Sequence, residues 1–174
     1  MRPSGVSLIE LLVCLLVGTV LAAAAMPSLS DLATKSRAAS ASNHLLSLLN
    51  QARSEAVMRR RTTSVCPSRD GLSCFATQDW SPGLLSWVDD NDNGQREEGE
   101  RVLRVMDGAD LHGQRLQGAA GRTNLGFRAD GRAAGRNATL KLCGQDGTLS
   151  RRIIINNGGR VRIEAAAGFE ACIA

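Results

Sequence analysis

The chain has 174 residues, of which 43% are hydrophobic but only 3% aromatic, and it carries a formal net charge of +4. This length leaves room for one domain plus an extended anchor, and the composition fits a small head with a thin aliphatic core. The mild positive charge permits anionic partners without requiring them. Acidic residues cluster between positions 89 and 110, whereas the C-terminal third is basic.

Residues 6–27 form an apolar run that contains a single carboxylate, Glu10. The run is about as long as an α-helix that crosses a bilayer, and Arg2 on its short N-terminal side agrees with the positive-inside rule. An unpaired carboxylate in such a run costs roughly 2.5–3.5 kcal/mol. Cleavage after Gly5 would give Val6 a free amine, which could neutralise Glu10 of a staggered neighbouring helix. The alternative is an ordinary membrane anchor with an isolated Glu.

A short basic leader that ends in Gly5, with Glu10 shortly after it, resembles the type IV prepilins. The resemblance implies that a prepilin peptidase cuts after Gly5, removes residues 1–5 and methylates Val6, which stands where the family usually has Phe. It also implies that residues 6–27 are a transmembrane helix in which Glu10 drives assembly with other pilins. We therefore expect a single-pass inner-membrane protein, with its head in the periplasm, that is incorporated into a pilus.

Residues 28–61 are predicted to be the amphipathic second half of this helix, because apolar residues recur there at three- and four-residue steps. From Thr62 onward the period changes to two, which predicts short strands separated by Gly-rich turns. The expected strands are 62–66, 84–88, 102–106, 124–128, 139–143, 152–156 and 160–164. The predicted class is α+β: a type IV pilin fold whose long N-terminal helix packs on an antiparallel β-sheet head at residues 62–174.

Four cysteines lie in the part of the chain expected outside the inner membrane, and their even number predicts disulfides in that oxidising compartment. They are Cys66, Cys74, Cys143 and Cys172. Sequence leaves three pairings open. We favour the nearest-neighbour pairing, because Asp70-Gly71 would form a turn between Cys66 and Cys74. The two bridges would contribute about 2.6 and 3.5 kcal/mol to stability in the chain-entropy model.

The acidic loop, residues 89–100, matches the pattern of an EF-hand calcium loop. Its ligands would be Asp89, Asn91, Asn93 and Glu100. The flanks, however, have the pattern of strands rather than helices, and clusters of Asp, Asn and Gly are common in hairpin turns. We favour a solvated acidic loop and expect no cofactor, with calcium as the alternative.

The C-terminal hairpin is the strongest candidate for a functional site. Alternation along a strand places Arg160 and Arg162 on one face and Val161 on the other, while Gly159 allows another backbone to approach closely. Paired guanidinium groups on a rigid element suit phosphate, and Arg151 and Arg152 would widen the patch. Lys141, Arg132 and Arg136 would extend it further. The alternative is that these arginines only protect an edge strand against aggregation.

The head also resembles the FimT/GspH family of minor pilins and pseudopilins. The resemblance rests on residues 50–57 with Cys66, on Trp80, Gly83 and residues 87–91, on Phe127 with residues 130–132, and on residues 142–143 and 158–162. In the FimT-type members, a Gly-Arg-x-Arg motif near the C-terminus binds DNA, and residues 159–162 match this motif. The resemblance thus implies binding to DNA through Gly159, Arg160 and Arg162.

The function predicted is that of a minor pilin that binds DNA non-specifically for uptake in natural transformation. Two alternatives need only the same anchor. One is a GspH-like pseudopilin of type II secretion, which binds other pseudopilins, and the other is an initiator of pilus assembly without a DNA role. No catalytic set is visible, so we expect a protein that is not an enzyme.

Overall fold

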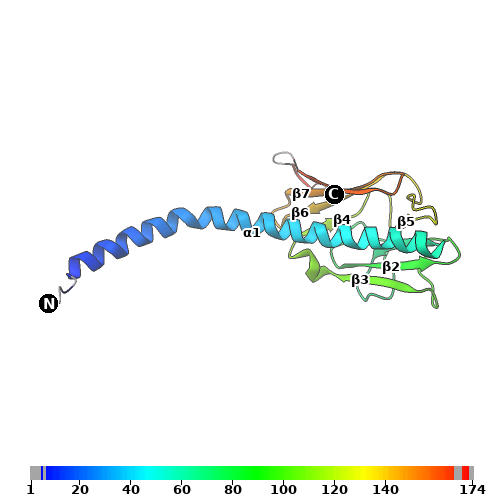
Figure 1. Ribbon diagram of the computed structural model, residues 1–174, viewed down its shortest axis with the longest axis horizontal. Helices are drawn as coiled ribbons and strands as arrows, with labels where there is room; N and C mark the ends of the chain where they lie inside the picture. The colour runs from blue at the N-terminus through cyan, green and yellow to red at the C-terminus, as the bar shows by residue number, and fades with distance from the viewer. Residues whose placement is uncertain (1–4, 6, 167–169, 173–174) are drawn as a thin grey trace. The chain divides into compact units, whose positions relative to one another are not determined.

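A computed structural model of the chain describes residues 5, 7–166 and 170–172, without the side chains of residues 22–31. One long helix, α1 (Leu8–Arg59), precedes all the strands (Figure 1). The strands are β1 (Thr62–Pro67), β2 (Gly83–Asp89), β3 (Val102–Asp107), β4 (Arg115–Gln117), β5 (Leu125–Phe127), β6 (Ala138–Cys143), β7 (Leu149–Ile155) and β8 (Val161–Ala165), with a short 3-10 helix η1 (Gly108–Leu111). The predicted α+β class is confirmed, and β4 and η1 are additions to the predicted elements.

The chain divides into two compact units, Met1–Ser36 and Arg37–Ala174, and the boundary falls within α1. In the first unit Glu10 lies in the first turn of α1 and is exposed, as are the apolar residues around it. Cys14 is a free, exposed cysteine. Val6, the predicted methylation site, lies outside the described residues. Over the part of the chain that the structure describes, no helix combines the length and apolarity that a membrane crossing requires.

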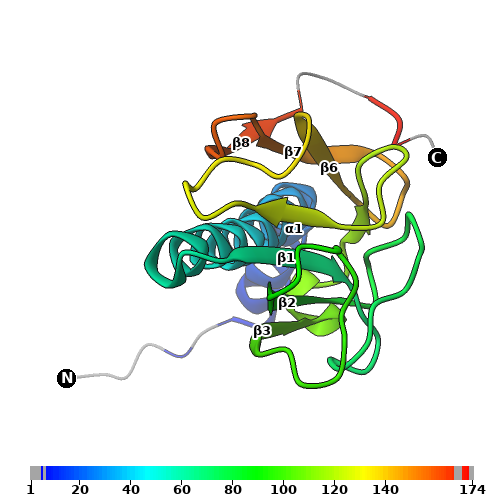
Figure 2. The ribbon, with the colours of Figure 1, turned by 90° about the vertical axis from the view of Figure 1, so that its right-hand side faces the viewer.

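The second unit, which consists of the C-terminal part of α1 and the β-sheet head, contains two antiparallel four-stranded sheets. One sheet has the order β3-β2-β1-β5 and the other β4-β6-β7-β8. The second half of α1 lies between them, as Figure 2 shows in a view along the helix. Both sheets turn one face toward this helix, and their buried residues join those of α1 in a single core.

The buried stripe of α1 follows the helical period. It consists of Ala38, Ala41, Leu45, Leu48, Leu49, Ala52 and Ala56, which recur at three- and four-residue steps. Phe127 of β5 and Leu140 of β6 are fully buried against the same core. Leu32 and Val57, also members of the predicted apolar pattern, are exposed. The amphipathic prediction therefore describes the helix best where both sheets cover it.

Two disulfides hold the loops of the head. The structure joins Cys66 to Cys74 and Cys143 to Cys172, which is the nearest-neighbour pairing. Cys66 and Trp87 form a second buried cluster, against which Cys74 packs. The Cys66–Cys74 disulfide therefore also holds a loop over this small apolar cluster.

Candidate nucleic-acid interface

The β7–β8 turn, residues 156–160, is held by its own backbone and by one side chain. The backbone N–H of Gly159 donates to the carbonyl of Asn156 at 2.8 Å, and that of Asn156 to the carbonyl of Arg160 at 3.1 Å. The side-chain Oδ1 of Asn156 accepts from the N–H of Arg160 at 2.9 Å. These bonds fix the point at which the Arg160 side chain leaves the turn.

Beyond the turn, β8 alternates between buried and exposed residues. Val161 is buried opposite Ile155, whereas Arg162 is exposed opposite Ile154. Arg160 is also exposed. Both arginines of the Gly-Arg-Val-Arg segment therefore face solvent while the valine between them anchors the strand in the core.

Gly159 is required by its surroundings rather than by the turn alone. Its φ is +77°, a region that favours glycine, and a Cβ at this position would lie 1.9 Å from the carbonyl oxygen of Gly131. The same oxygen accepts a 2.8 Å hydrogen bond from Nε of Arg53 on α1. The close approach that the sequence predicted at Gly159 is thus made by the chain's own backbone, and α1 fixes it.

The cations of β7 and β8 are partly neutralised. Nε of Arg162 lies 2.9 Å from Oε1 of Glu164, and both side chains are about half exposed. Arg152 forms an ion pair with Glu170. Arg160, in contrast, has no side-chain partner among the residues that the structure describes.

The other predicted members of the patch are spread over both faces of the sheet. Arg152 lies opposite Lys141 and Glu164 in the ladder, whereas Arg151 lies opposite Leu142 and Ala165. Consecutive residues of a strand point to opposite faces. Arg152 and Lys141 therefore share the face of Arg162, and Arg151 lies on the other face. Arg132 and Arg136 are exposed in the connection between β5 and β6.

The acidic loop is closed by its own hydrogen bonds. The buried carboxylate of Asp89 accepts from the backbone N–H groups of Asn93 and Gly94 at 3.1 and 2.8 Å. Glu100 accepts from the N–H groups of Asp90 and Glu97. Asn91 and Asn93 both donate their amides to Glu97. Within the described residues, no group of three or more His, Cys, Asp or Glu side chains is arranged to hold a metal ion.

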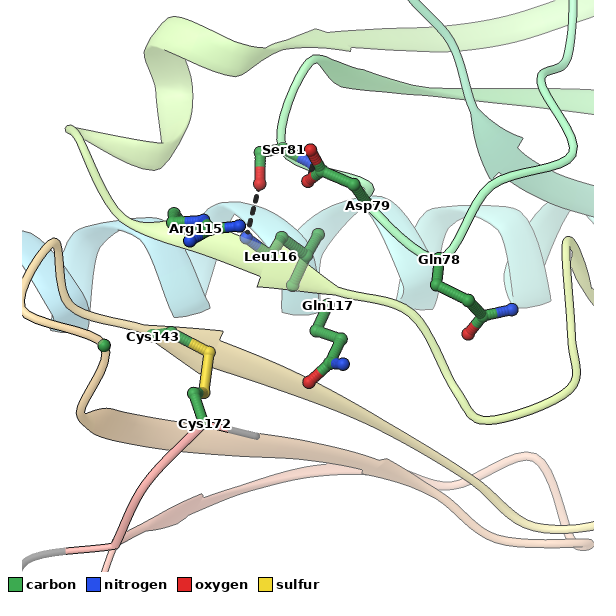
Figure 3. Close-up of a pocket in the computed structure, with 9 residues that line it drawn as sticks. Gln78, Asp79, Ser81, Arg115, Leu116, Gln117, Cys143 and Cys172 are labelled. Carbon is green, nitrogen blue, oxygen red and sulfur yellow. Dashed lines mark hydrogen bonds between the residues drawn. A yellow bond between two sulfur atoms is a disulfide. The ribbon is translucent and has the colours of Figure 1, made fainter. Parts of the chain in front are cut away.

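A cavity of about 260 Å³ lies beside the Cys143–Cys172 disulfide, between β4 and the segment before β2 (Figure 3). Ser81 closes one side of it, because its Oγ accepts a 2.9 Å hydrogen bond from the N–H of Leu116. Hydrogen bonds from the side chain and then the backbone N–H of Ser81, and after them the charge of Arg115, lower the pKa of Asp79, against the effect of its partial burial. Among the described residues that line this recess there is no histidine and no phosphate-binding loop.

The structure brings together two residues that are far apart in the sequence, His44 of α1 and His112 after η1. Their ring centroids are 5.7 Å apart, and Nδ1 of His44 lies 3.8 Å from Oδ1 of Asp110. Ser40 hydrogen-bonds Nε2 of His112 at 3.0 Å. No local sequence pattern indicates this pair, since the two histidines are 68 positions apart in the chain.

Two family models match the chain. The model described as type II transport protein GspH matches residues 41–159, and the prokaryotic N-terminal methylation motif matches residues 1–26. The first match ends at Gly159, so Arg160 and Arg162 lie just beyond it. No curated protein sequence matches the chain significantly.

Among solved structures, the chain is similar to two crystal forms of the type IV minor pilin FimU from Pseudomonas aeruginosa strain PAO1. The first has 27% sequence identity and a TM-score of 0.60, over 78% of this chain and 95% of that chain. The second has 27% identity and a TM-score of 0.55, over 77% and 98%. The long helix and the antiparallel head are therefore those of a pilin.

Proposed function

Because the chain belongs to the family of the type II transport protein GspH, we propose that it is a minor type IV pilin that binds extracellular DNA for uptake in natural transformation. The observation that carries this proposal is the pair of exposed arginines, Arg160 on the β7–β8 turn and Arg162 on β8, where Asn156 and the Gly159–Gly131 contact hold the turn in place. A rigid display of arginines suits phosphate, which guanidinium binds through two parallel hydrogen bonds.

The binding should depend on the DNA backbone rather than on the bases. Trp80, Trp87 and Phe127 are fully buried, so none of them can stack on a base. Phe75 is partly exposed, but the guanidinium of Arg69 lies over its ring, 5.4 Å from the centroid. Contacts to phosphate carry no sequence information, and they weaken steeply with salt because counterions are released on binding. Sequence-independent, salt-sensitive binding is appropriate for a receptor that takes up any DNA.

The N-terminal motif supports a place in the inner membrane and in the fibre. We infer that a prepilin peptidase cuts after Gly5 and methylates Val6, and that Glu10 then compensates the amine of a neighbouring pilin helix. The head would lie in the periplasm before assembly, where its two disulfides form. Its partners would be other pilins along the helix and DNA at the β7–β8 turn.

The second candidate function is that of a pseudopilin of type II secretion with no DNA role, and the description of the matching family favours it. The structural similarity to a type IV minor pilin supports a place in a pilus, with or without a DNA role. Both candidates need the same anchor and the same core. Only the DNA function needs Arg160 and Arg162.

A salt-titrated binding assay tests the proposal. The full chain in a nonionic detergent is titrated into fluorescent duplex DNA, and anisotropy is recorded at several salt concentrations. Arg160→Ala/Arg162→Ala should flatten the slope of log K against log salt by about 1.8, since each phosphate contact contributes about 0.9. A matched control is Arg101→Ala/Arg115→Ala, which removes the same charge from two other exposed arginines. No binding by the wild type at low salt, or an equal loss in the control, would contradict the proposal.

A further inference from the structure

The β5–β6 connection contains a second arginine-bearing turn, residues 128–132. The N–H of Arg128 donates to the carbonyl of Arg132 at 2.8 Å, and the N–H of Gly131 to the carbonyl of Arg128 at 2.8 Å. The two arginines thus oppose each other as in a hairpin, and opposed residues project to the same side. Both are exposed.

This second turn is packed directly against the β7–β8 turn. The carbonyl of Gly131 abuts Gly159, and the N–H of Ala133 donates to the carbonyl of Asn157 at 3.1 Å. Arg53 ties the contact to α1 through its bond to Gly131. Three exposed arginines, Arg128, Arg132 and Arg160, therefore stand on two turns that are packed and hydrogen-bonded together. We call these three residues and their turns the two-turn surface.

The two-turn surface is less neutralised than the strands beside it. On the strands, Glu164 pairs with Arg162 and Glu170 pairs with Arg152. On the two turns, no side chain among the described residues forms an ion pair with any of the three arginines. The nearest acid in the sequence is Asp130, whose Oδ1 accepts from the backbone N–H of Arg132 at 2.9 Å.

We propose that the DNA footprint is centred on the two-turn surface, with Arg128 and Arg132 as phosphate ligands that contribute as much to binding as Arg160. The inference rests on the proposed function, and it moves the footprint from the β8 edge to the end of the head where the two turns meet. Glu164 limits the contribution of Arg162, because a phosphate must compete with that carboxylate for the guanidinium. Arg53 is a positioning residue, which holds the second turn through Gly131.

Three variants of the full chain in nonionic detergent, titrated into fluorescent duplex DNA, test the inference. Arg128→Ala/Arg132→Ala should flatten the log-salt slope by about 1.8, which corresponds to a loss of up to about 60-fold at 0.1 M salt. Glu164→Gln should bind more tightly than the wild type and with a steeper slope. Arg101→Ala/Arg115→Ala is the matched control, because Arg115 lies on β4, at the edge of its sheet farthest from β8.

The outcomes separate the inference from the proposed function. If the wild type binds and Arg160→Ala/Arg162→Ala weakens binding, but Arg128→Ala/Arg132→Ala matches the control, the two-turn footprint is wrong and DNA binding stands. If the wild type does not bind, both fail. Far-UV circular dichroism with an unchanged melting temperature shows that each variant is folded. Arg128→Lys/Arg132→Lys keeps the charge and should restore most of the salt slope, which a purely structural role of the arginines would not predict.

Discussion

Replacing Gly159 by Ala probes the contact on which the proposed site depends. At a φ of +77° an L-residue costs about 1–2 kcal/mol. The new Cβ would also lie 1.9 Å from the backbone oxygen of Gly131, an atom that cannot rotate away as a flexible side chain can. Relief requires the two turns to separate, and this loosens the bond from Arg53 to that oxygen. We expect a total loss of about 2–4 kcal/mol in the free energy of unfolding.

Gly158→Ala is the matched control for this substitution. The nearest atom to a Cβ on Gly158 is Oδ1 of Asn156 at 3.4 Å, which is an ordinary van der Waals contact. Its effect should stay within about 0.5 kcal/mol. Thermal unfolding followed by circular dichroism should therefore show a melting temperature roughly 10 °C below the wild type for Gly159→Ala and nearly unchanged for Gly158→Ala. Equal melting temperatures for the two variants would refute the packing of the turns described above.

Three further predictions concern the disulfides, the acidic loop and pH. Replacing both cysteines of the Cys143–Cys172 disulfide by Ser should lower the free energy of unfolding in urea by about 3.5 kcal/mol, and the same change at Cys66–Cys74 by about 2.6 kcal/mol. The first loss is larger because that disulfide closes the longer loop, and the reverse order would contradict the chain-entropy argument. Adding a few millimolar calcium should shift the melting temperature by less than about 1 °C, because the carboxylate of Asp89 already accepts backbone N–H bonds; a larger shift would indicate a calcium site. Hydrogen bonds, first from the side chain of Ser73, hold the pKa of Asp70 well below its usual range. The ionised carboxylate of Asp70 therefore stabilises the folded state above about pH 4, and this stabilisation is lost as pH falls toward the folded-state pKa. The urea midpoint of the wild type should therefore fall more steeply below pH 4 than that of Asp70→Asn, and parallel curves would contradict this.

The sequence was sufficient for what depends on local periodicity. Alternation along β8 predicted that Arg160 and Arg162 face solvent and that Val161 is buried, and the structure agrees. The same rule applied to Arg151 and Arg152 indicates that they lie on opposite faces, so their separation was also available from the sequence. The pair of Arg162 with Glu164, two residues apart on one face, is a signal of the same kind.

Contacts between segments far apart in the chain were not predictable. Gly131 lies in the connection between β5 and β6, which belong to different sheets, whereas Gly159 lies in the β7–β8 turn. No local pattern in either segment encodes the contact between these two glycines. The bond from Arg53 to Gly131 spans 78 residues. β4 has only three residues, too few for a period to be recognised, and it is defined by pairing with β6. Such features depend on the tertiary packing of the two sheets around α1.

The most direct test of the central claim measures DNA uptake and secretion in the same cells. The gene is deleted from its own bacterium and replaced by the wild type, by Arg160→Ala/Arg162→Ala or by Arg101→Ala/Arg115→Ala. We predict that the first variant abolishes uptake of labelled duplex DNA while protein secretion, pilus number and the amount of the protein stay at wild-type levels, and that the control variant behaves as the wild type. Normal DNA uptake by Arg160→Ala/Arg162→Ala, together with a secretion defect in the deletion strain, would contradict the DNA-binding function and establish the secretion role instead.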